Sequence, residues 1–140
     1  MNGEFVLIDT DVASFLFKRD TRAQLYRPHL SGKIVVLSFM SLAELYRWAE
    51  VRKWGDQRRR QMEQHIRNFV VHGYSRQLCQ TWARIMATAE RRGRELECAD
   101  GWIGATAVLH GIPLVTHNRR HYEGVEGLKV ISEAENGGAP

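Results

Sequence analysis

Four segments of the chain place an acidic or amide side chain where an apolar run ends. They are Val6 to Asp11, Ser41 to Leu45, Ala99 to Ile103 and Leu114 to Asn118. The first and last are typical of buried strands, and the middle two are typical of helix starts. If the strands are parallel, all four segments meet at one edge of a single sheet. Carboxylates held that close repel one another, and a divalent metal ion is the simplest counter-charge. The pattern therefore indicates a metal-dependent enzyme.

Three acids from three segments form the candidate site, namely Asp9, Glu44 and Asp100, and Asn118 is its neutral fourth member. A carboxylate as deep in an apolar run as Asp9 is costly unless it is paired or bound to metal. Mg²⁺ prefers oxygen ligands and keeps several waters, so a few carboxylates suffice. In phosphodiester cleavage such an ion activates a water and neutralises charge on the phosphate, and the sequence leaves open whether one ion or two do this.

Each acid also has a purely structural alternative. Asp9 could serve only as the cap of the helix that follows it. Ser41 and Glu44 have the spacing of a capping box. Asp11 and Asp100 suit the first turn of a helix because the helix dipole favours acids there. The set of acids at one expected sheet edge, and no single member of it, favours the functional interpretation.

Short apolar runs and helical periodicity predict the elements that position these residues. The predicted strands are Phe5–Ile8, Ile34–Leu37, Leu114–Thr116 and, at an edge, Leu128–Ile131. The predicted helices are one capped by Thr10, a short one from Thr21 that Pro28 ends, one from Ser41 to about Trp54, one capped by Asp56 that carries Met62, Ile66, Phe69 and Val70, one from Ser75 to about Arg92, and one from Asp100 to His110.

Strands that alternate with helices predict a parallel sheet covered on both faces. We therefore expect an α/β fold, a three-layer α/β/α sandwich with a central parallel sheet of four to five strands. Ligands of such sheets bind beyond the carboxyl ends of the strands. Asp9 and Asn118 would lie at those ends, and Glu44 and Asp100 could border the same crevice.

The 140 residues predict a single domain over residues 1–135, with a flexible tail at 136–140. No apolar run approaches the roughly 18 residues of a membrane-spanning helix, and we find no secretory signal. Cys79 and Cys98 lack partners at metal-ligand spacing, so we expect reduced thiols and no zinc site. We expect a cytoplasmic protein with no membrane partner.

An excess of arginine gives the chain a net charge of +4 and a pI near 9.4. Arginine forks match the geometry of phosphate groups, so Arg58, Arg59, Arg119 and Arg120 are candidate RNA contacts. A basic rim around an acidic centre suits a nuclease. The alternative is that these runs are solvated helix faces.

The four acidic segments resemble the motifs of the PIN-domain ribonucleases and, within that family, the VapC-type toxins of bacterial toxin–antitoxin pairs. The resemblance covers essentially the whole chain. It rests on Leu7-Ile8-Asp9-Thr10-Asp11-Val12, Ser41-Leu42-Ala43-Glu44-Leu45, Asp100 to Ala107 and Leu114 to Tyr122. Each motif is weak alone, but four in this order, with matching strands and helices, are specific.

The resemblance implies a PIN-like fold and an endoribonuclease that depends on Mg²⁺, for which Mn²⁺ could substitute. It implies Asp9, Glu44 and Asp100 as the metal ligands and Thr10 and Thr116 as supporting hydroxyls. The substrate would be tRNA or another structured RNA. The partners would be a second copy in a homodimer and a cognate VapB-like antitoxin that blocks the acidic pocket in a toxin–antitoxin hetero-oligomer.

The chain departs from the family pattern at Asn118, where many members have aspartate. Because an amide carries no charge, we expect Asn118 to weaken a second metal site. Asp11 is a plausible auxiliary carboxylate, and His117 and His121 are expected to be surface histidines. Gly104 replaces the usual alanine and is expected to loosen its helix slightly. Two other functions stay open: a housekeeping RNA-processing or DNA-cleaving enzyme of the same fold, and a non-catalytic module that binds nucleic acid.

Overall fold

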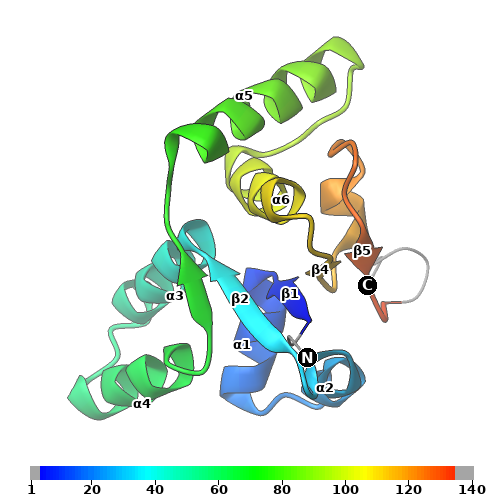
Figure 1. Cartoon of the computed structure of the whole chain (residues 1–140). Coiled ribbons are helices and arrows are strands. Elements are labelled where there is room, and N and C mark those ends of the chain that lie inside the picture. Colours follow the sequence, from blue (N-terminus) through cyan, green and yellow to red (C-terminus); the bar gives the residue numbers. More distant parts are fainter. Residues whose placement is uncertain (1–3, 135–140) are drawn as a thin grey trace.

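The computed structural model describes residues 4–134, so the predicted flexible tail at 136–140 lies outside the described residues. One sheet of five parallel strands runs through the molecule in the order β3-β2-β1-β4-β5 (Figure 1). The strands are β1 (Phe5–Ile8), β2 (Ile34–Ser38), β3 (Val70–His72), β4 (Leu114–Val115) and β5 (Val130–Ile131). The predicted parallel sheet is confirmed.

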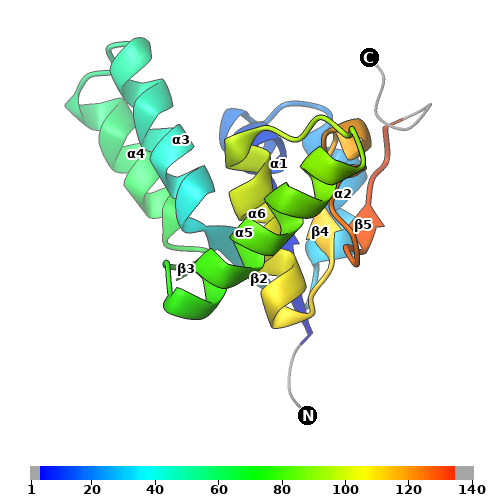
Figure 2. The same cartoon turned by 90° about the horizontal axis from the view of Figure 1, so that it is seen from above.

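Helices cover both faces of this sheet and complete the three predicted layers (Figures 1 and 2). They are α1 (Thr10–Lys18), α2 (Ala23–Leu30), α3 (Phe39–Val51), α4 (Asp56–Ile66), α5 (Arg76–Arg91), α6 (Cys98–His110) and the short 3₁₀ helix η1 (Arg119–Tyr122). Helices α5 and α6 pack together on one face, and α1 and α2 pack on the other. The strand order reverses direction between β1 and β4, which places a crevice at the carboxyl ends of these two strands.

The side chains of β1 divide the hydrophobic core into two parts. Val6 and Ile8 pack with the apolar residues of α1, α2 and α4, whereas Leu7 packs with those of α5 and α6. All three side chains are buried. Full burial of one such side chain contributes about 1.5–3 kcal/mol. Because β1 is held from both faces, the residue that follows it, Asp9, has a fixed position.

The prediction for residues 69–72 was wrong. Helix α4 ends at Ile66, and Val70 begins strand β3, which pairs in parallel with Val36 to Ser38 of β2. The spacing of Phe69 and Val70 after Met62 and Ile66 fits the apolar face of a helix. The β-branched Val70 and Val71 equally favour a strand, so the local pattern did not distinguish the two. As an edge strand β3 is short and partly exposed.

The predicted helix caps were wrong in three places. The side chain of Asp9, not that of Thr10, caps α1, and Gly55, not Asp56, precedes α4. Helix α3 begins three residues early because the Ser38 hydroxyl accepts a hydrogen bond from Met40 N, so Ser41 and Glu44 form no capping box.

Two further predictions concern helix ends. Pro28 does not end α2, which continues to Leu30 and closes with a bond from Ser31 N to Arg27 O. Helix α6 starts at Cys98, two residues before the expected start. The predicted cap of α5 is confirmed, since the Ser75 hydroxyl accepts from Leu78 N.

Two glycines let α6 approach its neighbours closely. A Cβ on Gly101 would lie 2.5 Å from Met86 Sδ and 3.0 Å from Trp82 Nε1 of α5. A Cβ on Gly104 would lie 3.1 Å from a Val125 methyl group. The absence of a side chain at Gly104 thus lets α6 pack closely against Val125, a role that the sequence alone did not suggest.

No helix within residues 4–134 is long and apolar enough to cross a membrane. Cys79 and Cys98 are free thiols, and both are exposed.

Candidate active site

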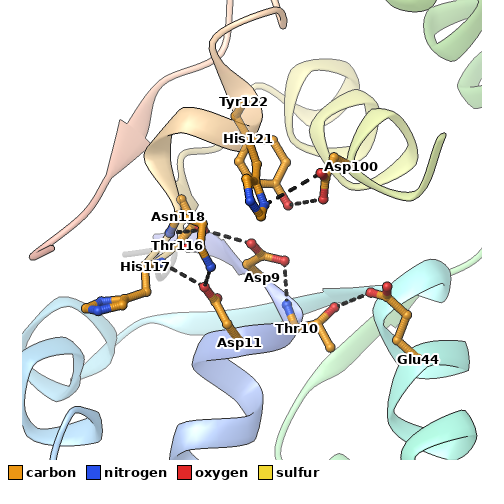
Figure 3. A network of polar contacts seen from close by, with 10 residues as sticks. All are labelled: Asp9, Thr10, Asp11, Glu44, Asp100, Thr116, His117, Asn118, His121 and Tyr122. Atoms are coloured by element: carbon orange, nitrogen blue, oxygen red, sulfur yellow. Dashed lines mark hydrogen bonds and ion pairs between the residues drawn. The ribbon is translucent and has the colours of Figure 1, made fainter. Parts of the chain in front are cut away.

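The residues predicted from the four segments gather at the carboxyl ends of β1 and β4 (Figure 3). Asp9 follows β1, and Thr116 and Asn118 follow β4. Asp100 comes from the first turn of α6 and Glu44 from the second turn of α3. Parallel strands and the starts of their helices therefore bring together side chains that are far apart in the sequence.

Asp9 lies at the centre of the site and is only 6% exposed. One carboxylate oxygen accepts from Thr10 N at 2.6 Å, and the other accepts from the Thr116 hydroxyl at 2.7 Å. Burial raises the pKa of Asp9 above its ordinary value, although the bonds from Thr116 and Thr10 oppose this. Asp9 is therefore both a helix cap and the central carboxylate, so the two interpretations of its role are compatible.

Asp11 is held by the segment after β4. Its Oδ2 accepts from Asn118 Nδ2 at 2.6 Å and from His117 N at 3.2 Å. Burial and the nearby charge of Asp9 raise the pKa of Asp11 to about 8. The Asn118 backbone also donates to the Thr116 hydroxyl at 3.0 Å. The amide of Asn118 therefore serves as a donor to Asp11, a role that an aspartate at this position could fill only when protonated.

Asp100 faces the centre of the site from α6. Its Oδ1 accepts a hydrogen bond from the Tyr122 hydroxyl at 3.4 Å, and Oδ2 lies 3.7 Å from His121 Nδ1. Burial and the charge of Asp9 raise the pKa of Asp100 to about 6, and His121 opposes the shift. The Tyr122 side chain is buried, and its hydroxyl reaches into the site from η1 to bond Asp100 (Figure 3).

Glu44 stands apart from the other acids. Its Oε1 accepts from the Thr10 hydroxyl at 2.6 Å, and that hydroxyl also shares a 2.8 Å hydrogen bond with the buried Ser41. Burial raises the pKa of Glu44, and the charge of Asp9 adds to the effect. Thr10 thus connects α3 to the site through its side chain, and Glu44 remains half-buried at the rim.

The donor set fits a divalent cation in part. Within residues 4–134, no Lys or Arg forms an ion pair with Asp9, Asp11, Glu44 or Asp100, and each of these carboxyls has a raised pKa. The same residues contain no three His, Cys, Asp or Glu side chains close enough to share one ion. Asp9 and Asp100 with several waters match the usual Mg²⁺ environment, whereas Glu44 would have to turn from Thr10 to join them.

The four candidate RNA contacts divide into two places. Arg119 and Arg120 form the start of η1, directly after Asn118, and Arg120 lines a cavity of about 330 Å³ together with Asp100. Arg58 instead lies over the rings of Phe17 and Trp54, 4.3 and 5.0 Å from their centroids.

Arg59 has structural partners as well. It donates to Glu50 Oε2 at 2.8 Å and to Trp54 O at 2.8 Å, and so fastens the connection between α3 and α4. Of the four candidate arginines, Arg120 shares a cavity with Asp100 and Arg119 precedes it in η1, whereas Arg58 and Arg59 have partners elsewhere.

Two residues that shape the site, Ser41 and Tyr122, lie inside the motifs, but the sequence did not indicate a role in the site for either of them. His117 was expected on the surface, but its ring is partly buried against Phe15 and its pKa is lowered by burial and by the charge of Arg22. Neither the residue type of Tyr122 nor its spacing from the other motif residues indicates a role in the site. Only its place inside the fourth motif could have suggested it.

Comparisons with known proteins agree with this geometry. The family model described as "PIN domain" matches residues 6–126. The chain is 26% identical over 123 residues to the tRNA(fMet)-specific endonuclease VapC of Shigella flexneri, which covers 88% of this chain and 93% of that protein. It is 24% identical, with the same coverage, to ribonuclease VapC2 of Haemophilus influenzae.

Solved structures share the fold. VapBC2 from Rickettsia felis bound to a promoter DNA fragment superposes with a TM-score of 0.81 at 15% identity, covering 91% of this chain and 98% of that one. FitAcB from Neisseria gonorrhoeae gives 0.78 at 23% identity, covering 91% and 96%. The family match spans nearly the whole described chain and includes every acid of the site, and the chain belongs to the PIN-domain family.

Proposed function

We propose that this protein is a Mg²⁺-dependent endoribonuclease that acts as the toxin of a toxin–antitoxin pair. The observation that carries the proposal is that two carboxylates, the buried Asp9 and Asp100, face one carboxyl edge of a PIN-domain sheet without a Lys or Arg partner among residues 4–134. His121, near Asp100, is the one basic side chain in an ion pair with either of them in that part of the chain. The curated relatives are named as VapC ribonucleases, which supports the RNA substrate.

Asp9, Asp100 and Glu44 would hold the metal, which when bound would supply an activated water and neutralise charge on the scissile phosphate. The remaining groups orient these ligands. Thr116 and the Thr10 N–H fix both oxygens of Asp9. The Tyr122 hydroxyl donates to Asp100 and so orients that carboxylate.

The opening beside Asp100 offers a path for the RNA. The cavity there is lined by two arginines, Arg94 and Arg120, and by three acids besides Asp100, namely Glu95, Glu97 and Glu123. Arginine at the rim attracts the phosphate backbone, whereas the carboxylates keep phosphate from settling there without metal. We therefore place Arg119 and Arg120, and not Arg58 and Arg59, along the substrate path.

The proposed partner is a VapB-like antitoxin, because solved structures of this fold include toxin–antitoxin complexes such as the DNA-bound VapBC from Salmonella typhimurium. That structure has a TM-score of 0.76 at 24% identity and covers 94% of this chain and 98% of that one. We also propose a homodimer and a cytoplasmic location, where RNA substrates and antitoxin are found.

Cleavage of a tRNA panel and of other structured RNAs with Mg²⁺ or Mn²⁺ tests the proposal. We expect defined internal cuts that stop when EDTA removes the metal and that are absent in Asp100→Asn. Expression should arrest growth, and co-expression of an adjacent antitoxin gene should relieve the arrest. Cleavage that proceeds equally in EDTA or in Asp100→Asn would contradict the proposal. Cleavage without toxicity would indicate RNA processing, and metal-independent binding without cleavage would indicate a binding module.

A further inference from the structure

Tyr26 of α2 is a fully buried tyrosine whose hydroxyl reaches the segment that carries Thr116 and Asn118. The Tyr26 oxygen lies 2.5 Å from His117 Nδ1 and accepts a hydrogen bond from Glu133 N at 3.1 Å. Neither of these bonds joins Tyr26 to Asp9, Asp11, Glu44 or Asp100, so Tyr26 supports the site from outside the acidic centre.

The directions of these two bonds follow from the donors available. A backbone N–H can only donate, so the bond from Glu133 N occupies a lone pair of the Tyr26 oxygen. The single hydroxyl proton of Tyr26 is then free to point at His117. We assign Nδ1 of His117 as the acceptor of this hydrogen bond, an assignment in which the imidazole is neutral and carries its own proton on Nε2.

The ring of His117 is held on its other sides as well. Its centroid lies 5.3 Å from that of Phe15, and the two rings meet edge to face at 81°. It meets the Tyr26 ring in the same manner, at 5.6 Å and 85°. The ring therefore has one packed position, and the Tyr26 hydroxyl sets its rotation.

His117 is the middle residue of the segment that touches both central acids. Its own N–H donates to Asp11 at 3.2 Å, the Thr116 hydroxyl donates to Asp9 at 2.7 Å, and the Asn118 amide donates to Asp11 at 2.6 Å. The ring that Tyr26 holds is thus attached to the short backbone segment from which all three donors project.

We propose that Tyr26 is a positioning residue for the active site, acting through the His117 ring to hold Thr116 and Asn118 against Asp9 and Asp11. The inference rests on the proposed function, since the effect is on RNA cleavage. It assigns a role to α2, a helix that contributes no residue to the acidic centre.

Tyr26→Phe removes the hydroxyl and keeps the ring, so it isolates the hydrogen bond. We expect kcat for RNA cleavage to fall about fivefold, which corresponds to the loss of one ordinary hydrogen bond. The KM for RNA should change less than twofold, because the basic rim is untouched. Tyr46→Phe is the matched control: Tyr46 is an exposed tyrosine of α3, and its loss of a hydroxyl should leave the parental kcat unchanged.

A double-mutant cycle tests whether Tyr26 acts through His117. His117→Phe keeps an aromatic ring against Phe15 and removes Nδ1. If the inference is correct, Tyr26→Phe lowers kcat in the parent and has no further effect in His117→Phe. Additive losses in the double variant would overturn it, as would a Tyr26→Phe variant that melts lower but cleaves with the parental kcat.

The ¹⁵N chemical shifts of the His117 ring give a readout in the unmodified protein, even if a variant fails to fold. We expect an unprotonated Nδ1 that accepts a hydrogen bond and a protonated Nε2, and a proton on Nδ1 would overturn the inference. If the parent itself shows no metal-dependent cleavage, the proposed function fails. If the parent cleaves and Tyr26→Phe cleaves equally well, only the role of Tyr26 fails.

Discussion

The site has two halves that are built differently. The strand-end half, made of Asp9, Asp11, Thr116 and Asn118, is closed by short hydrogen bonds among its own members. The helix half, made of Glu44 and Asp100, comes from α3 and α6, and its two acids make one hydrogen bond each, to Thr10 and to Tyr122. The first half is organised by the sheet, and the second depends on how two helices are placed around it.

This difference separates the interactions that the fold supplies by itself from the oxygens that would be left for the proposed cation. Hydrogen bonds from hydroxyl and backbone groups hold the strand-end carboxylates in position although burial disfavours their charge. The helix-half acids keep few partners, so their oxygens are free to bind a metal. The comparison therefore predicts unequal costs when residues of the two halves are changed.

Asp9→Asn should produce the largest loss. Asparagine can keep the helix cap through its Oδ1, and its Nδ2 can donate to the Thr116 hydroxyl where Asp9 accepts from it, but the charge is removed. We expect RNA cleavage to fall about a hundredfold or more, while the melting temperature stays equal or rises because a buried charge has been removed. Cleavage assays and thermal unfolding of the same preparation measure both. Asp56→Asn, an exposed acid at the start of α4, is the control and should change neither.

Glu44→Gln should cost less, about tenfold in cleavage rate. Glutamine can still accept from the Thr10 hydroxyl, so the link between α3 and the site survives. The measurement is the cleavage rate against Mg²⁺ concentration, and the loss should be partly recovered at high Mg²⁺. A loss as large as that of Asp9→Asn would break the comparison, because Glu44 would then be a central ligand.

The stability of the metal-free protein should depend on pH in a direction set by both halves. The folded pKa values of Asp100, about 6, and Asp11, about 8, lie above the ordinary value of 3.8. The folded state therefore binds protons more tightly than the unfolded state, and stability falls as the pH rises from about 4 to about 8.

Thermal unfolding between pH 5 and 8.5, with and without Mg²⁺, measures this dependence. Asp11→Asn should flatten the part of the decline between about pH 6 and 8. Mg²⁺ should raise the melting temperature more at pH 8 than at pH 5, because the ion binds the charged carboxylates. If the stability of Asp11→Asn declines between about pH 6 and 8 as steeply as that of the parent, Asp11 is not a cause of the pH dependence.

The strand-end half was the part most open to prediction from sequence. An apolar strand that ends on Asp9 has few possible positions, and parallel strands bring Thr116 and Asn118 to the same edge. Once these side chains share one edge, the Thr116 hydroxyl is close enough to Asp9 to donate a hydrogen bond to it. What the sequence could not predict was the donor role of Asn118 toward Asp11, because it depends on the path of the backbone after β4.

The helix half and the edge of the sheet were harder to predict. The capping-box spacing of Ser41 and Glu44 matched a common local pattern, but Ser38 caps α3 and the tertiary bond to Thr10 uses both side chains. Likewise Val70 satisfied a helical period and a strand preference equally, and pairing with β2 decided between them. Local patterns failed where a long-range contact had the larger effect.

Arg120→Gln should give the smallest effect and tests whether RNA enters beside the helix half. Arg120 shares a cavity with Asp100, whereas Arg58 is engaged by Phe17 and Trp54. Loss of one phosphate contact should weaken RNA binding about threefold and lower the slope of log K against log salt by about 0.7. Binding is measured in Asp9→Asn to prevent cleavage. Arg58→Gln in the same background should bind as tightly as Asp9→Asn alone, and an equal loss in both arginine variants would mean that the RNA also crosses the α1–α4 surface.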